Sequence, residues 1–298
     1  VIMFDKPFSV IHADLSDQNM VITFDTEKSV VATIGTSFTS ADGARKNMLK
    51  EISEFNFNRL RQETEQIWKQ TLGKVVVSGG TEEDKIKFYT ALYHCYQLPR
   101  IANDVDGSYQ GFAEDTVIHT AEGFEYYDDF SMWDTYRALH PLMTILEPER
   151  TLDMVKSLVL KAEQGGWMPI FPAWASYTVA MIGDHVSTMI SDAYIKGIKH
   201  FDIETAYKYM RQNAFDSPSG EEYVDGKGRR ALQSYLKFGY IPLEDSVWNA
   251  FHRREQVSRT LEYALDDYAL ARVAKAIGKN DDYKILIKRS GNYKNVFD

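Results

Sequence analysis

EQVSRTLEYALDDYALARVAKAIG, residues 255–278, is the stretch that decides the fold. It contains no proline, and its first glycine is Gly278, where a helix can end. Apolar residues recur along it at helical spacing. They predict a helix with one apolar face, formed by Val257, Leu261, Ala264, Tyr268, Ala271 and Ala274. This periodicity predicts a helix from residue 255 to residue 277.

The same periodicity predicts further helices on either side. One starts at the capping-box pattern of residues 81–84, one carries Met132, Tyr136, Leu139 and Met143, and one opens at Pro148. Others are expected over 186–198, 203–213 and 281–290. Loops rich in aromatic residues, glycine and aspartate lie at 103–109, 124–130 and 165–174. Paired helices joined by such loops favour a mainly α fold, an α/α toroid whose loops gather at one end.

The first forty residues have a different pattern. Short β-branched and aromatic runs at 8–11, 19–24 and 29–38 predict strands, and polar residues that include Ser16 and Asp17 predict the turns between them. Three such strands are typical of the end of a larger β-sheet. A long polar helix is expected from about residue 44 to residue 72, connecting this β remnant to the helical part.

The composition excludes several classes of protein. The chain has 298 residues, of which 44% are hydrophobic and 26% charged, as in an ordinary globular protein. Its net charge is −9, from 34 Lys and Arg against 43 Asp and Glu, which argues against a nucleic-acid partner. No apolar run approaches the roughly 20 residues of a membrane span. Cys95 is the single cysteine, so no intrachain disulfide can form, and its apolar neighbours indicate a buried thiol.

The densest group of chemically useful residues is YYDDFSMWDTYR, residues 126–137. Carboxylates alternate here with large aromatics, a mixture suited to sugars because an indole packs on the apolar face of a pyranose while charged groups bind its hydroxyls. Trp133, Asp134 and Arg137 are the candidates for such contacts. The alternative is a helix N-terminus capped by Asp134 or Ser131 beside core aromatics, and both interpretations remain open.

A second group contains Trp174, Tyr177, Asp184 and His185. Asp184 precedes a predicted helix, so a role as a plain helix cap is as plausible as a contact with substrate. His185 could equally be a core histidine that donates to a backbone carbonyl.

A third group consists of the carboxylates of Glu262, Asp266 and Asp267 in the helix predicted over 255–277. Glu262 and Asp266 are four residues apart and share a face, where like charges repel unless a cation intervenes. Arg259 is the expected partner, and a structural salt network is the favoured interpretation. Asp104 and Asp106 could bind a hard cation such as calcium, although an Asp-x-Asp-Gly turn is a weak signal.

Several longer motifs make the resemblance specific. The chain resembles glycoside hydrolase family 92, the calcium-dependent inverting exo-α-mannosidases. The similarity runs from the Val30 strand to the C-terminus, with the motifs in the family's order. The motifs are Phe88–His94, Asp104–Tyr109, Phe130–Pro141, Gln164–Gly166, Met181–His185 and Val257–Asp267.

The resemblance implies a fold and a function. Residues 1–40 would be the tail of an N-terminal β-sandwich domain, residues 41–80 a linker helix and turn, and residues 81–298 the N-terminal part of an (α/α)6 catalytic domain. The activity implied is removal of terminal α-linked mannose from glycans with inversion, assisted by a calcium cofactor. Trp133 and Asp134 would line the mannose pocket, with Arg137 in support. A secreted or periplasmic location follows from the family.

The chain departs from the family at Tyr177. In members that cleave α-1,2 linkages, a glutamate at this position of an Asn-Glu-Thr motif acts as general acid, and Tyr177 takes its place here. A phenol, with a pKa near 10, is a weak acid at neutral pH. The chain also starts at Val1 and ends without a stop signal, so we expect a fragment. The family's main calcium segment and its pair of catalytic-base aspartates are expected beyond Asp298, with weak or no activity for these residues alone.

Two alternatives come from other functional classes. One is a non-catalytic carbohydrate-binding homologue in which Tyr177 has replaced the acid. The other is an α/α-toroid polysaccharide lyase, in which Tyr177 and His185 would form the base and acid pair. Assays on α-mannosides and on uronic-acid polymers separate the three functions.

Overall fold

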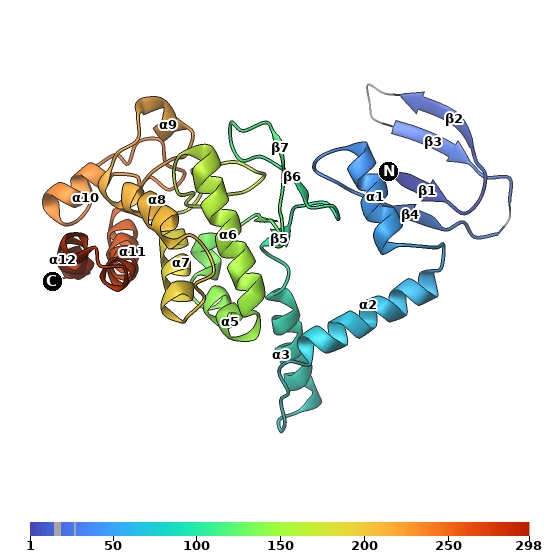
Figure 1. The fold of residues 1–298 in the computed structure, drawn as a ribbon, viewed down its shortest axis with the longest axis horizontal. Helices are drawn as coiled ribbons and strands as arrows, with labels where there is room; N and C mark the ends of the chain where they lie inside the picture. Colours follow the sequence, from blue (N-terminus) through green and yellow to red (C-terminus); the bar gives the residue numbers. More distant parts are fainter. Residues whose placement is uncertain (15–18, 27, 298) are drawn as a thin grey trace.

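The computed structural model describes residues 1–14, 19–26 and 28–297, and Figure 1 shows its arrangement. Its described part is mainly helical. A small β unit with α1 lies at one end, α2 runs diagonally to α3 below the middle, and the remaining helices pack together at the other end. The turn expected at Ser16 and Asp17 lies outside the described residues.

Four short antiparallel strand pairs accompany the helices. In the N-terminal unit, β1 (Ile2–Phe4) pairs with β4 (Ala32–Ile34), and β2 (Ser9–Asp14) pairs with β3 (Asn19–Thr23). Farther along, β5 (Arg100–Ile101) pairs with β8 (Tyr127–Asp128), and β6 (Ser108–Gln110) pairs with β7 (Ile118–Thr120). The three predicted N-terminal strands are confirmed, while β1 was not expected.

The connection to the helical part is two helices instead of one. They are α1 (Ala41–Glu51) and α2 (Phe57–Leu72). The break occurs because Asn56 acts as a new N-cap, and its side chain accepts a hydrogen bond of 3.0 Å from the Arg59 amide. The prediction of one continuous helix from 44 to 72 is therefore wrong.

The later helices agree with the sequence in position. They are α3 (Glu82–His94), α6 (Pro148–Gly165), α7 (His185–Ile195), α8 (Ile203–Phe215), α11 (Gln256–Ala276) and α12 (Asn280–Arg289), followed by the 3-10 helix η1 (Ser290–Val296). The capping box of α3 forms between Thr81 and Asp84, and Pro148 occupies the first turn of α6. Two short helices, α9 (Gly220–Val224) and α10 (Leu232–Phe238), were not expected.

The helix expected through Met132 and Met143 is also broken. It consists of α4 (Met132–Thr135) and α5 (Leu139–Leu146). Pro141 explains the break, since its ring would clash with the carbonyl of Arg137 in a continuous helix, whereas it is tolerated in the first turn of a new one. The break leaves Arg137 between the two helices.

One large apolar core holds the helical part together. It is built from α6, α7, α8 and α11, with Leu158, Ile190, Met210 and Leu270 fully buried in it. Consecutive helices pack side by side, α5 on α6, α6 on α7 and α7 on α8, and α11 packs against α7, α8 and α12. In Figure 1, α11 lies between α12 and α7.

The face that α11 buries differs from the predicted one. Ala264, Ala271 and Ala274 are buried as expected, but Val257 and Tyr268 are 45% and 43% exposed. Glu262, Asp266 and Asp267 are buried on this helix. The apolar pattern fails because these carboxylates have charged partners inside the protein, which lowers the cost of burying them.

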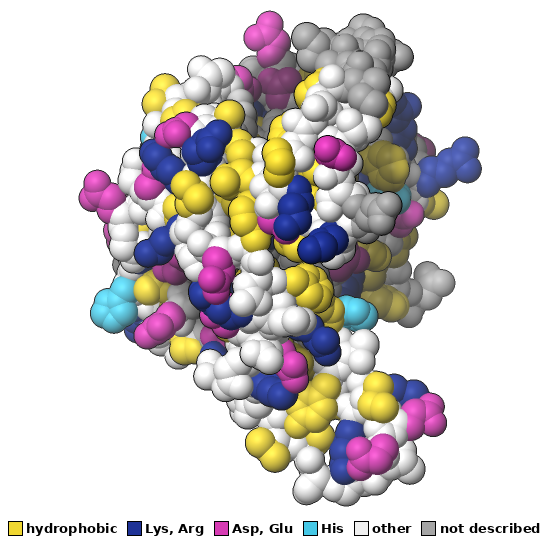
Figure 2. All heavy atoms as spheres, turned by 90° about the vertical axis from the view of Figure 1, so that its right-hand side faces the viewer, with side chains coloured by type: hydrophobic (Ala, Val, Ile, Leu, Met, Phe, Trp, Pro, Cys, Tyr) yellow, Lys and Arg dark blue, Asp and Glu magenta, His cyan; other side chains and the backbone are white. Residues whose placement is uncertain are grey.

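The described surface carries both signs of charge. On the face in Figure 2, Lys and Arg side chains are interspersed with Asp and Glu and with yellow apolar patches. Among the described residues, we find no helix that combines the length and the apolar character a membrane crossing requires.

Candidate active site

The short helix α4 presents two of the predicted sugar-contacting residues. Asp134 is exposed, and its carboxylate accepts a hydrogen bond of 2.5 Å from the Ser131 hydroxyl. Ser131 stands at the N-cap, yet its side chain makes no capping hydrogen bond. Trp133 is partly exposed, and the Arg137 guanidinium lies over its ring at 5.1 Å. Trp133, Asp134 and Arg137 thus lie close together at the surface, as the sequence predicted, with Asp134 held by Ser131 instead of serving as a cap.

Glu262 of α11 fixes the inner side of this group. Its two carboxylate oxygens accept hydrogen bonds from Arg137 (3.0 Å) and from the Tyr136 hydroxyl (2.8 Å). Burial opposes the charge of Glu262, but His185, Tyr136 and Arg137 outweigh it and lower the pKa of the carboxyl. Glu262 is therefore a carboxylate at neutral pH, and it anchors a surface arginine to the core.

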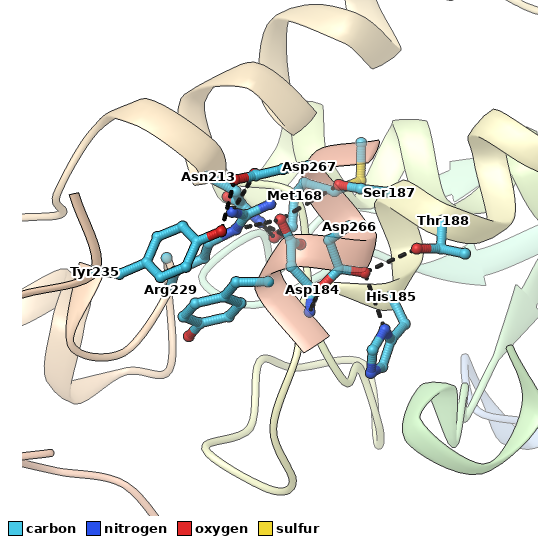
Figure 3. Close-up of polar contacts among 12 residues, drawn as sticks. Met168, Asp184, His185, Ser187, Thr188, Asn213, Arg229, Tyr235, Asp266 and Asp267 are labelled. Atoms are coloured by element: carbon cyan, nitrogen blue, oxygen red, sulfur yellow. Dashed lines mark hydrogen bonds and ion pairs between the residues drawn. The ribbon is translucent and has the colours of Figure 1, made fainter. Parts of the chain in front are cut away.

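His185 lies directly beneath, between two carboxylates of α11. Its Nδ1 is 2.9 Å from Asp266 and its Nε2 is 3.1 Å from Glu262. Its ring stacks on Tyr136, with 3.7 Å between ring centroids. Burial opposes the imidazolium, but Asp266 and Glu262 raise the pKa of His185 to about 9. Figure 3 shows the ring of His185 pointing at Asp266, and the Thr188 hydroxyl donates to the same carboxylate oxygen.

A second ionic cluster continues from there into the core. The Arg229 side chain, fully buried, donates to Asp184 (2.9 Å) and to Asp267 (2.7 Å). Asp267 also accepts two hydrogen bonds of 2.7 Å from Arg289. Burial raises the pKa of Asp184 to about 6, against the opposing charge of Arg229. In Figure 3 these side chains from distant parts of the sequence converge on α11.

These contacts confirm a structural salt network on α11, with different partners from those expected. Arg259 was predicted to pair with Glu262, but its guanidinium donates to the His252 carbonyl at 2.7 Å. Arg137 and His185 take that place. The prediction for Arg259 is wrong because residues that are neighbours on a helix surface can still point to different partners once both are buried.

Asp184 and His185 lie behind the surface group. They are 0% and 1% exposed, and their polar partners include Arg229, Asn213, Asp266 and Glu262. Asp184 stands at the N-cap of α7 without making a side-chain cap bond. The direct contact with substrate that the sequence suggested for these two residues stays a prediction, whereas their support of α11 is observed.

Tyr177 belongs to a separate buried cluster. Its hydroxyl donates to the Trp167 carbonyl (2.7 Å) and accepts from the Trp167 amide (3.1 Å). Its ring meets Phe112 edge-on, and a side chain at Gly165 would collide with its hydroxyl. Burial raises the pKa of the phenol above its usual range. Its role as a replacement for the family acid stays a prediction. In the structure, the Tyr177 hydroxyl forms its hydrogen bonds with the backbone of Trp167.

Trp174 lies in a loop held by the residues just before α4. Its indole is 81% exposed, and its amide donates to Asp129 at 2.9 Å. The Phe130 amide donates to Pro172, and Ala102 donates to Tyr126. The three loops expected to gather at one end therefore do meet, around the strand pair β5 and β8.

Asp104 and Asp106, the two aspartates suggested for calcium, are held by partners within the protein. Asp104 is buried and accepts hydrogen bonds from Ser37, Thr39 and Asn47, while Asp106 accepts from Lys46 and the Ser108 amide. Over residues 1–14, 19–26 and 28–297, no three His, Cys, Asp or Glu side chains come together as a metal would require. The calcium cofactor implied by the resemblance stays a prediction.

Two buried cations were not found from the sequence. Arg229 follows the glycine-containing turn at Gly226 and Gly228, both with positive φ, which directs it inward. Lys161 is fully buried on α6, where it lies 2.9 Å from Asp128. Lys161 lies on the buried face of α6 together with Met154 and Leu158. A lysine at a position where the helical spacing calls for an apolar residue was the sequence signal for this buried charge.

Comparison with known proteins agrees with this arrangement. Residues 43–298 match the glycosyl hydrolase family 92 catalytic domain. The chain belongs to glycosyl hydrolase family 92. The fold resembles the structure of a family 92 α-mannosidase from Bacteroides thetaiotaomicron, with a TM-score of 0.81 and 31% identity over 100% of this chain and 40% of that one. A second structure of that enzyme contains mannoimidazole.

Two further relatives complete the comparison. A family 92 inverting mannosidase from Bacteroides thetaiotaomicron VPI-5482 matches with a TM-score of 0.83 and 26% identity, over 100% of this chain and 41% of that one. A protein of Arthroderma benhamiae described as an uncharacterized secreted glycosidase is 28% identical over 275 residues, 90% of this chain and 30% of that protein. The chain thus spans well under half of these family 92 relatives. The described helices form part of the (α/α)6 toroid, as predicted.

Proposed function

We propose that the whole protein is an α-mannosidase that removes terminal α-linked mannose from glycans with inversion. The proposal is supported by membership of family 92 and by the two mannosidase structures that share the fold of this chain. The observation that carries it is the surface group of Trp133, Asp134 and Arg137, because it combines an aromatic face, an exposed carboxylate and a fixed guanidinium.

Each member of the group has a part in binding the sugar. The indole of Trp133 packs on the C–H face of the mannose ring, and Asp134 accepts hydrogen bonds from its hydroxyls. Arg137 donates to a ring hydroxyl while Glu262 holds its other side. Ser131 keeps the Asp134 carboxylate oriented before substrate arrives. This organisation reduces the ordering cost of binding.

Inversion requires an acid on the leaving oxygen and a base that activates water, roughly 6.5–9.5 Å apart. We assign neither role to a residue of the surface group. Glu262 is unsuited to donate a proton because three neighbours stabilise its charged form. Calcium dependence is part of the proposal for the whole protein, and no step is derived through calcium. Secretion is also part of the proposal, and it is supported by the description of the Arthroderma benhamiae relative as a secreted glycosidase.

The lyase alternative needs Tyr177 and His185 as a pair. The described contacts commit Tyr177 to the Trp167 backbone and both nitrogens of His185 to α11. This arrangement favours the mannosidase over the lyase.

The test is hydrolysis of 4-nitrophenyl α-mannoside, which releases a single mannose, by the whole protein, followed by proton NMR from the first minute. We expect β-mannose to appear before mutarotation, and we expect chelation by EDTA to reduce the rate, with calcium restoring it. Release of α-mannose would overturn inversion. No mannose release, with binding retained, would favour the non-catalytic homologue.

A further inference from the structure

Four residues around one pocket adopt strained backbone conformations. Ala113, Asp129, Trp174 and Ala175 all have positive φ angles, between 53° and 61°, although none is glycine. They are tied to one another, since the Ala113 amide donates to the Ala175 carbonyl at 2.8 Å and the Trp174 amide donates to Asp129. Strain of this kind persists where the surrounding structure enforces it, which is common at binding sites.

Two of these four residues, Trp174 and Ala175, line a cavity. The cavity has a volume of about 180 Å³, and Trp174 and Ala175 line it together with Phe38, Arg100 and Gln110. Sites for drug-sized ligands are roughly 300–1,000 Å³, so this one suits a single small ring. The Trp174 side chain is almost entirely exposed, and an exposed aromatic held on a rigid loop is a stacking platform.

Two adjacent carboxylates hold the pocket in place. Asp129 accepts from the Trp174 amide with one oxygen and pairs with Arg100 Nε at 2.5 Å with the other. Asp128 accepts from the Ala175 amide at 2.8 Å and pairs with the buried Lys161. One carboxylate therefore fixes both the guanidinium and the residue that carries the indole.

The charges around the pocket compensate one another. Arg100 faces Asp129 and Asp128 faces Lys161, so each charge on the wall or behind it has an opposite partner. The Arg100 side chain is still 42% exposed, and Gln110 is exposed beside it, so both can bind a ligand in the cavity. Such a wall suits a neutral polar ligand better than a phosphate or a uronate.

We propose that this pocket is a second sugar subsite, which binds one neutral hexopyranose ring of the glycan while the terminal mannose occupies the surface group around Trp133. Trp174 stacks on the ring, and Arg100 and Gln110 bind its hydroxyls. The proposal rests on the proposed function only for the identity of the glycan. Asp128 and Asp129 act as positioning residues.

The test measures sugar binding by the whole protein without turnover. The probes are methyl α-mannoside and S-linked α-mannobiose, whose sulfur bridge resists hydrolysis, titrated by calorimetry and by tryptophan fluorescence. We expect Trp174→Ala to weaken the disaccharide about tenfold or more, and to weaken it more than the monosaccharide. Gln110→Ala, a milder change, should also weaken binding of the disaccharide more than binding of the monosaccharide. Asp129→Asn should also do so, because it loosens both Arg100 and Trp174.

The matched control is Trp248→Ala, because Trp248 is another tryptophan with a largely exposed side chain, 58%. It should leave both affinities unchanged, and circular dichroism should show all variants folded. Equal weakening of both sugars by Trp174→Ala, or none, overturns the subsite. If this pocket binds mannose 6-phosphate more tightly than the neutral sugar, the proposed preference for a neutral ligand is wrong. Failure of the mannosidase assay with Trp174-dependent disaccharide binding intact would overturn the proposed function and leave the subsite standing.

Discussion

His185 Nε2 lies 3.1 Å from Glu262 Oε2, and the two residues come from different helices, α7 and α11. On its other side, Nδ1 of the same ring lies 2.9 Å from Asp266. The imidazole thus separates two carboxylates that share a face of α11 and would otherwise repel each other. Glu262 in turn holds Arg137, so this contact links the buried salt network to the surface on which the sugar is proposed to bind.

The first prediction is a pH-dependent loss of stability that depends on His185. Its folded pKa of about 9 exceeds the unfolded value of about 6.5. The stabilisation is therefore fully present below about pH 6.5 and is lost as pH rises through 9. The two values correspond to a free energy on the order of 3 kcal/mol.

Urea unfolding of the whole protein at pH 6, 7.5 and 9 measures this effect. The His185→Gln variant should be less stable at pH 6 and should lose the decline between pH 6.5 and 9. His200→Gln is the control, because His200 is an exposed histidine, and it should keep the decline. A decline of the same size in His185→Gln would show that another group causes it.

The second prediction concerns Glu262. Glu262→Gln removes the charge that faces both His185 and Arg137, so unfolding should become easier by about 1–3 kcal/mol. Sugar affinity should fall as well, since Arg137 loses its anchor. Thermal unfolding and titration with methyl α-mannoside measure the two effects. Glu163→Gln, an exposed residue of α6, should change neither, and an unaltered midpoint for Glu262→Gln would contradict the anchoring role.

The third prediction concerns Asp134, which lies outside the apolar core. Asp134→Asn should leave the thermal midpoint within a degree or so, because the carboxylate is exposed and bonds to Ser131 alone among its described partners. Loss of a charge-assisted hydrogen bond to a sugar hydroxyl should cost about 1.5–3 kcal/mol of binding, or one to two decades in affinity. A large drop in midpoint with unchanged mannoside turnover would instead identify Asp134 as a helix cap.

The fourth prediction separates two roles for Tyr177. Its hydroxyl bridges the amide and the carbonyl of Trp167, so Tyr177→Phe should cost about 1–3 kcal/mol of stability by leaving these groups unpaired. Turnover should change by less than tenfold. If Tyr177 were the proton donor, the rate would fall by about 10²–10⁴ instead. Tyr240→Phe, a more exposed tyrosine, serves as the control for both measurements.

Local sequence features determined where most helices begin and end. Thr81 with Asp84, Pro148 and Gly278 mark ends that the structure confirms, because caps and chain breakers act over a few neighbouring residues. The grouping of Trp133, Asp134 and Arg137 was predictable for the same reason, since they are near neighbours in sequence. The family could be identified from motif order, which needs no coordinates.

The tertiary structure alone decided which residues share an environment. The charged face of α11 is buried, against its apolar periodicity, because Arg229 and His185 arrive from segments far away in sequence to neutralise it. The link from Asp129 to both Arg100 and Trp174 is equally invisible to local patterns. The spacing of apolar residues in one segment predicts which face of a helix is buried. The burial of a charge depends in addition on partners that only the folded chain brings within hydrogen-bonding distance.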